Sequence, residues 1–211
     1  MTNELLDPIK IATIVAAKEC ESVDSSLELL CVFGEDGEGL GLAPRILCHR
    51  LGLIHKSVFC FIGNSEGHLL LQTRKGGRLD VAVGGHLCGD DSSAEDAIIR
   101  EISEEIGLEV NADRLRIISS YRKNGGDRLS KPREINNELR ILYYIELSDS
   151  ECQALAGKFN GRRDKDAILS IEWFDAHDVL AACDAGRAAD GLSASIPHYL
   201  LWSRIQPGVR G

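Results

Sequence analysis

Residues 84–108 read GGHLCGDDSSAEDAIIREISEEIGL, and the second half of this stretch carries three glutamates at helical spacing. Glu101, Glu104 and Glu105 stand at positions i, i+3 and i+4, so a helix would place their side chains on one face. Like charges at this spacing repel one another by roughly 0.2–0.5 kcal/mol. A hard divalent cation with oxygen ligands would offset that repulsion. The alternative is a solvated acidic helix face, and the surrounding residues bear on the choice.

The residues around the glutamates predict where this helix begins and ends. Four polar residues before it can cap its first turn: Asp90, Asp91, Ser92 and Ser93. Ala97, Ile98 and Ile102 supply the side that would be buried, and Gly107 is a typical helix terminator. The pattern predicts one amphipathic helix with an apolar face and an acidic face.

The charge balance argues against one class of partner. The chain has 24 Lys and Arg against 33 Asp and Glu, a formal net charge of −9, which disfavours broad, sequence-independent binding of nucleic acid. No run approaches the roughly 18 to 20 apolar residues of a membrane helix, and the start MTNELLDPIK lacks the features of a secretory signal. Seven scattered cysteines without a CxxC pair indicate reduced thiols. We therefore expect a cytoplasmic protein without a membrane or nucleic-acid partner.

Two regions are expected along the 211 residues. Residues 1–26 have helix-compatible apolar spacing and are expected to form an N-terminal helical arm, which packs either on the domain or on a second subunit of a homodimer. Residues 27–211 contain no repeat and no linker long enough to divide them. One domain is therefore expected over this range.

The order of the expected elements predicts the fold class. Strands are expected at 27–33, 57–63, 68–74, 115–121, 139–147 and 168–174, and a glycine-rich turn at 34–41. Besides the helix above, helices are expected at 43–56, at 175–186 with Asp175 as its cap, and near the C-terminus from about Pro197. This order indicates an α/β domain, with a mixed, curved β-sheet sandwiched between helices.

Residues 100–108, REISEEIGL, match at every position the second half of the Nudix box, REUxEExGU with U apolar. In the first half, a one-residue insertion near Asp90–Asp91 aligns Gly85 with the opening glycine of the box. The chain therefore resembles the Nudix hydrolase superfamily, whose fold is the α/β arrangement just described.

Other stretches narrow the resemblance to the isopentenyl-diphosphate isomerase-like branch. PRILCHRLGLIHKSV at 44–58, a hairpin ending LLLQTR at 69–74, and GGH at 84–86 are similar to that branch, as are IEWFDAHDVL and SIPHYLLW near the end. The resemblance thus covers about residue 28 to the C-terminus and leaves only the arm outside.

Three features distinguish the hydrolases of this branch from the true isomerases. The isomerase protonates an alkene with a cysteine, and Gly84 occupies the position of that cysteine here. Cys88, two residues beyond His86, is the cysteine that could take its place. The isomerase also has a Glu-x-Glu triplet where this chain has Asn136-Asn137-Glu138. Finally, the isomerases do not keep the full set of glutamates on the Nudix helix, whereas this chain keeps all three. The resemblance therefore favours a hydrolase of diphosphates.

The resemblance implies roles for the residues of the box. Glu101, Glu104 and Glu105 would hold Mg²⁺, with Mn²⁺ as an alternative, and Arg100 would orient a box glutamate by an ion pair. The general base would be a box glutamate or a carboxylate from elsewhere, with Glu138 as one candidate.

Two further groups of residues follow from the resemblance. Three histidines correspond to metal ligands of the isomerase and, with Glu138, predict a second metal site; they are His49, His55 and His86. Imidazoles suit Zn²⁺ or Mn²⁺ better than Mg²⁺, and the alternative is that these histidines are structural hydrogen-bonders. Arg74 and Lys75 match basic positions that face the diphosphate of the substrate.

Three functions remain open at this point. The first is a Mg²⁺-dependent Nudix pyrophosphohydrolase that cleaves a nucleoside diphosphate derivative or another small organic diphosphate. The second is isopentenyl-diphosphate isomerisation, and the third is a ligand-binding Nudix domain without catalysis. The box handles phosphates and metal, so it does not specify the organic group.

Overall fold

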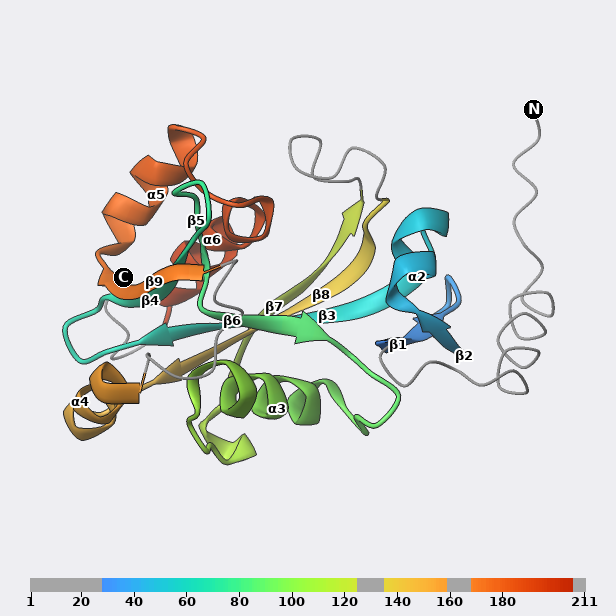
Figure 1. Ribbon diagram of the computed structural model, residues 1–211, viewed down its shortest axis with the longest axis horizontal. Helices are drawn as coiled ribbons and strands as arrows, with labels where there is room; N and C mark the ends of the chain where they lie inside the picture. Colours follow the sequence, from blue (N-terminus) through green and yellow to red (C-terminus); the bar gives the residue numbers. More distant parts are fainter. Residues whose placement is uncertain (1–27, 125–134, 159–167, 207–211) are drawn as a thin grey trace. The chain divides into compact units, whose positions relative to one another are not determined.

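The helix expected from the acidic stretch is α3, Ala94–Ile106, in the computed structural model of the chain (Figure 1). Its buried residues are Ala97, Ile98, Ile102 and Ile106, which is the apolar face that the spacing predicts. Gly107 follows with φ +67°, a left-handed conformation that glycine adopts at helix ends without steric cost. The sequence prediction for this helix is confirmed.

The structure describes residues 28–124, 135–158 and 168–206. Chain contacts divide them into two compact units. The first unit comprises 28–57, 86–94, 121–124 and 135–140, and the second comprises 58–85, 95–120, 141–158 and 168–206. The expected arm at 1–26 lies outside the described residues, and one domain over 27–211 stays a prediction.

In the first unit, a hairpin packs beside a short helix. Strand β1, Leu29–Phe33, pairs antiparallel with β2, Gly39–Pro44, and with β3 through the pair Val32↔His55. Helix α2, Arg45–Leu51, contacts both β1 and β2. Four side chains form the buried core of this unit: Leu30, Val32, Ala43 and Cys48. The expected turn at 34–41 is thus too long, because pairing with β1 already begins at Gly39.

In the second unit, β4, Leu69–Arg74, pairs antiparallel with β5, Leu79–Val81, and with β9, Ile168–Phe174. Helices α5, Ala176–Asp184, and α6, Asp190–Ser203, contact each other, and α6 also contacts β5 (Figure 1). The unit also contains the 3₁₀ helix η1, Ala112–Arg114, and α4, Asp149–Lys158. Asp175 caps α5 by accepting from the His177 N–H at 2.7 Å, as predicted.

Four strands contribute residues to both units: β3, Ile54–Gly63; β6, Val83–His86; β7, Arg116–Asn124; and β8, Asn137–Glu146. With a mixed, open sheet and five α-helices within the described ranges, the fold class is α/β, as predicted. None of the described helices is long and apolar enough to cross a membrane.

Two helices, α6 and α4, differ from the expectation. Helix α6 begins at Asp190 rather than near Pro197, which lies inside it; the apolar residues before the proline, Leu192 and Ile196, are buried and extend the helix toward its N-terminus. Helix α4 was not predicted. Its sequence, DSECQALAGK, has little apolar periodicity. At its start, Glu151 accepts from the Ser148 N–H at 2.9 Å and pairs with Arg114 at 2.6 Å.

Candidate functional site

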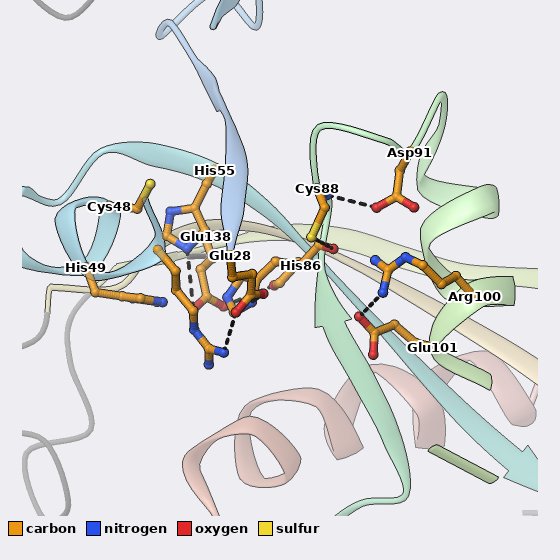
Figure 2. A network of polar contacts seen from close by, with 12 residues as sticks. Glu28, Cys48, His49, His55, His86, Cys88, Asp91, Arg100, Glu101 and Glu138 are labelled. Atoms are coloured by element: carbon orange, nitrogen blue, oxygen red, sulfur yellow. Dashed lines mark hydrogen bonds and ion pairs between the residues drawn. The ribbon is translucent and has the colours of Figure 1, made fainter. Parts of the chain in front are cut away.

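The first candidate site is the set of glutamates on α3, in the second unit. Glu101 is largely buried and Glu104 is exposed. Nη1 of Arg100 lies 2.8 Å from Glu101 Oε1 and 3.3 Å from Glu104 Oε2; Figure 2 shows the contact with Glu101. The ion pair expected of Arg100 is therefore present, and it restrains two of the three carboxylates.

Two glycines of β6 allow the glutamates to approach the strand. The Gly84 N–H donates to Glu105 Oε2 at 3.1 Å. A Cβ at position 85 would collide with Glu101 Oε1, so this carboxylate occupies the volume that any larger side chain at 85 would need. Gly85 aligns with the opening glycine of the Nudix box, and this close approach gives a physical reason for a glycine there.

The electrostatics at these glutamates favour a bound cation. Burial raises the pKa of Glu105 to about 8, against the Gly84 hydrogen bond, and the neighbouring Glu101 carboxylate adds to the rise. A buried carboxylate close to a second one is costly to ionise unless positive charge is brought to it. A divalent cation with oxygen ligands supplies that charge, so the donor set fits Mg²⁺ or Mn²⁺.

The basic residues expected to meet a diphosphate lie at the end of β4. Arg74 Nε donates to Asp80 Oδ2 at 2.7 Å, and 49% of the Arg74 side chain remains exposed. Asp80 is buried, and its other oxygen accepts from the Val81 N–H at 2.9 Å. The aspartate therefore orients the guanidinium while leaving part of it accessible. Lys75 is exposed in the turn that follows.

The second candidate site is a buried cluster in the first unit. Its members are His49, His55, His86 and Glu138, whose candidate ligand atoms all lie within 4.8 Å of one another. The ring centroid of His55 lies 4.8 Å from that of His49 and 5.3 Å from that of His86. Figure 2 shows these side chains gathered together. The structure thus assembles the set that the resemblance implied.

Backbone hydrogen bonds bring the four cluster residues together from four elements. His49 lies in the last turn of α2, His55 in β3, His86 at the end of β6 and Glu138 near the start of β8. The Ile135 N–H donates to the His49 carbonyl at 2.7 Å, and the Leu87 N–H donates to the Lys56 carbonyl at 3.0 Å. These bonds tie the segments that carry Glu138 and His86 to those that carry His49 and His55.

Glu138 is held at one of its oxygens. Oε2 accepts from Arg140 Nη2 at 2.5 Å and from Ser57 Oγ at 3.0 Å, while Oε1 lies 4.0 Å from His55 Nε2. Burial opposes ionisation, but the Arg140 charge and the nearby imidazoles lower the pKa of Glu138 to about 2. Because Arg140 and Ser57 bind Oε2, Oε1 is the oxygen that faces His55 and could ligate a cation. The role of Glu138 as general base stays a prediction.

The chemistry of the cluster fits a transition ion. Burial lowers the pKa of His55, which keeps the imidazole neutral and able to coordinate. His55 Nε2 is buried and has no hydrogen-bond partner among the described residues, although buried polar atoms are nearly always paired. Three imidazoles and one carboxylate suit Zn²⁺ or Mn²⁺ better than Mg²⁺.

Three functional candidates were missed from the sequence, and two of them, Glu28 and Phe59, depend on non-local contacts. Glu28 precedes β1, and its Oε1 lies 3.5 Å from His86 Nδ1 while Oε2 accepts from Arg45 Nη1 at 2.8 Å. The Phe59 ring occupies the space that a Cβ at Gly84 would need. Arg140 contacts Glu138, which lies two residues before it on β8. Side chains two apart share one face of a strand, so this contact could have been predicted from the sequence.

The comparisons with known proteins identify the family of the chain. The NUDIX domain family matches residues 53–194. The isopentenyl-diphosphate Delta-isomerase of Clavibacter michiganensis is 28% identical over 107 residues, which cover 47% of this chain and 54% of that protein. An uncharacterized Nudix hydrolase of Pseudomonas aeruginosa is 33% identical over 90 residues, covering 40% of this chain and 53% of that protein. The chain thus spans about half the length of these curated relatives.

A solved structure shows the same fold. The crystal structure of DR0079 from Deinococcus radiodurans has a TM-score of 0.58 at 24% identity, and the match covers 81% of this chain and 97% of that one. The family match extends over more than half of the chain and includes the α3 glutamates, as the resemblance of REISEEIGL to the Nudix box predicted. The chain belongs to the Nudix family.

Proposed function

We propose that this protein is a metal-dependent Nudix pyrophosphohydrolase acting on small organic diphosphates, nucleoside diphosphate derivatives among them. The observation that carries the proposal is the packing of the α3 carboxylates against β6. Glu105 accepts from the Gly84 N–H at 3.1 Å, and Glu101 fills the space beside Gly85. This arrangement keeps two carboxylates side by side in a largely buried position.

The proposed reaction is addition of water across the diphosphate linkage, which breaks one phosphorus–oxygen bond and leaves phosphate on both products. Glu101, Glu104 and Glu105 would hold Mg²⁺, and the bound ion would supply positive charge for the phosphate oxygens and for activation of a water molecule. Arg100 would keep Glu101 and Glu104 in position through its ion pairs. The exposed part of Arg74 would bind phosphate oxygens while Asp80 orients its guanidinium.

Isopentenyl-diphosphate isomerisation is the second candidate, because the buried histidine cluster matches the metal site that the resemblance attributes to the isomerases. The surroundings of Gly84 oppose it. Cδ1 of Phe59 lies so near the Gly84 backbone that a Cβ on residue 84 would collide with the ring. Residue 84 is a glycine rather than the isomerase cysteine, and a cysteine would not fit there without movement of the Phe59 ring.

A substrate panel with Mg²⁺ would test the proposal, with cleavage of the diphosphate linkage and isoprenoid isomerisation followed together. Glu104→Gln is the informative variant, because this side chain is exposed and its loss should leave the fold intact. Glu109→Gln is the matched control; Glu109 is exposed just beyond α3 and accepts from Ser103 Oγ at 2.7 Å. We expect hydrolysis in the parent and in Glu109→Gln, and a loss of about 10²-fold or more in Glu104→Gln.

Three other outcomes would contradict the proposed function. Hydrolysis that survives Glu104→Gln would contradict the role of the α3 glutamates. Isomerisation without cleavage of the diphosphate linkage would replace the proposal with the second candidate. Ligand binding without either reaction across the panel would favour a non-catalytic Nudix domain.

A further inference from the structure

All three imidazoles of the histidine cluster present Nδ1 to an oxygen. His55 Nδ1 lies 2.8 Å from the Leu53 carbonyl, and His49 Nδ1 lies 2.9 Å from Asn136 Oδ1. His86 Nδ1 lies 3.5 Å from Glu28 Oε1. These oxygens are acceptors, so in each neutral ring the proton belongs on Nδ1 and the lone pair on Nε2.

In this tautomer, Nε2 is the ring nitrogen that would ligate a metal. Metal-bound histidines characteristically donate their other ring N–H to a carboxylate or carbonyl oxygen, which fixes the ring orientation and raises the basicity of the ligand nitrogen. Here the three acceptors are a main-chain carbonyl, an amide and a carboxylate, and they come from different segments of the first unit. The cluster is therefore surrounded by the supports of a metal site as well as containing its ligands.

Asn136 takes a different part from the one that its position suggests. The resemblance aligns Asn136 with a metal-binding carboxylate of the isomerase. By position alone, the amide therefore indicates that one metal ligand has been lost. In the structure its side-chain oxygen contacts His49 Nδ1, which places it behind the imidazole. In the same way, Glu28 Oε1 lies beside Nδ1 of His86, and Glu28 Oε2 accepts from Arg45 at 2.8 Å.

We propose that Glu28 and Asn136 are positioning residues, which fix the ring orientation and tautomer of His86 and His49 through Nδ1 and so make the cluster a preformed site for a transition ion such as Zn²⁺ or Mn²⁺. Glu138 supplies one carboxylate oxygen, because Arg140 and Ser57 hold the other. The proposal rests on metal binding at the histidine cluster and is independent of hydrolysis at the α3 glutamates.

Metal titration without substrate tests this proposal. The full chain, stripped with chelator and carrying Glu104→Gln to weaken the competing site, is titrated with Zn²⁺ by calorimetry, and with Co²⁺ while its visible spectrum is recorded. Glu28→Ala and Asn136→Ala should each lower the affinity by about 10–100-fold. Glu28→Gln and Asn136→Asp keep an oxygen that can accept from Nδ1, and they should restore most of the affinity.

Two further variants make the result specific. Glu35→Ala removes another exposed glutamate of the first unit that is paired with an arginine, Arg122 at 2.9 Å, and it should leave the affinity unchanged. His55→Ala should abolish the Co²⁺ spectrum. Equal affinity in the parent, Glu28→Ala and Asn136→Ala would overturn the proposal, as would a Co²⁺ spectrum that survives His55→Ala. Neither result would affect the α3 glutamates, whose own test is hydrolysis.

Discussion

Arg140 Nη2 lies 2.5 Å from Glu138 Oε2, and the two side chains are only 4% and 5% exposed. The guanidinium also reaches Tyr121 Oη at 3.3 Å and Ser57 Oγ at 3.4 Å. This buried pair fixes the carboxylate beside the histidine cluster and compensates its charge.

Removal of Arg140 alone should destabilise the protein strongly. Arg140→Met leaves Glu138 as a buried charge without its main partner, and we expect the free energy of unfolding to fall by roughly 3–5 kcal/mol. The double variant Arg140→Met/Glu138→Gln should recover a large part of the loss, since no charge is then left buried. Urea unfolding measures both, and a loss below about 1 kcal/mol in the single variant would contradict the expectation.

Gly85→Ala should impair catalysis more than stability. The new Cβ would overlap Glu101 Oε1, so the flexible end of the glutamate must move away from its place beside β6. A displacement of about 1 Å can cost on the order of 10²-fold in rate, and we expect such a loss in kcat with little change in Tm. Gly39→Ala is the control, because a Cβ at Gly39 meets nothing within 4 Å. Equal kcat in the two variants would count against this role of Gly85.

Gly84→Cys should not produce an isomerase. The cysteine would collide with the Phe59 ring, and overpacking of this kind costs typically about 1–3 kcal/mol. We expect a lower Tm and no detectable isoprenoid isomerisation. Adding Phe59→Ala should relieve the collision and bring the Tm back toward that of Phe59→Ala alone. A Gly84→Cys variant as stable as the parent would show that the ring moves aside freely.

Arg74→Ala should weaken substrate binding. Its guanidinium is oriented by Asp80 and remains 49% exposed, and a charged hydrogen bond to phosphate contributes about 1.5–3 kcal/mol, which corresponds to roughly 10–100-fold in KM. Asp80→Asn should raise KM by a smaller factor, because the arginine stays but loses its anchor. Arg116→Ala, an exposed arginine on β7, is the control. A KM unchanged in Arg74→Ala would remove this residue from the diphosphate site.

The parts of the fold that could be predicted are those with strong local periodicity. Helix α3 follows from the spacing of Ala97, Ile98 and Ile102 and from Gly107, because a helix buries residues three and four apart. Helix α4 has no such spacing, and the glycine-rich residues of β2 resemble a turn until β1 supplies pairing partners. Packing with other segments decided these elements.

The sequence alone determined that three carboxylates share the α3 face. Glu101, Glu104 and Glu105 lie within one and a half helical turns, so helix geometry brings them together whatever the rest of the chain does. The tertiary structure decided the contacts that depend on distant segments: Asn136 behind His49, Glu28 beside His86 and Phe59 over Gly84. Such contacts join residues far apart in the chain, and local propensity carries no information about which of them will meet.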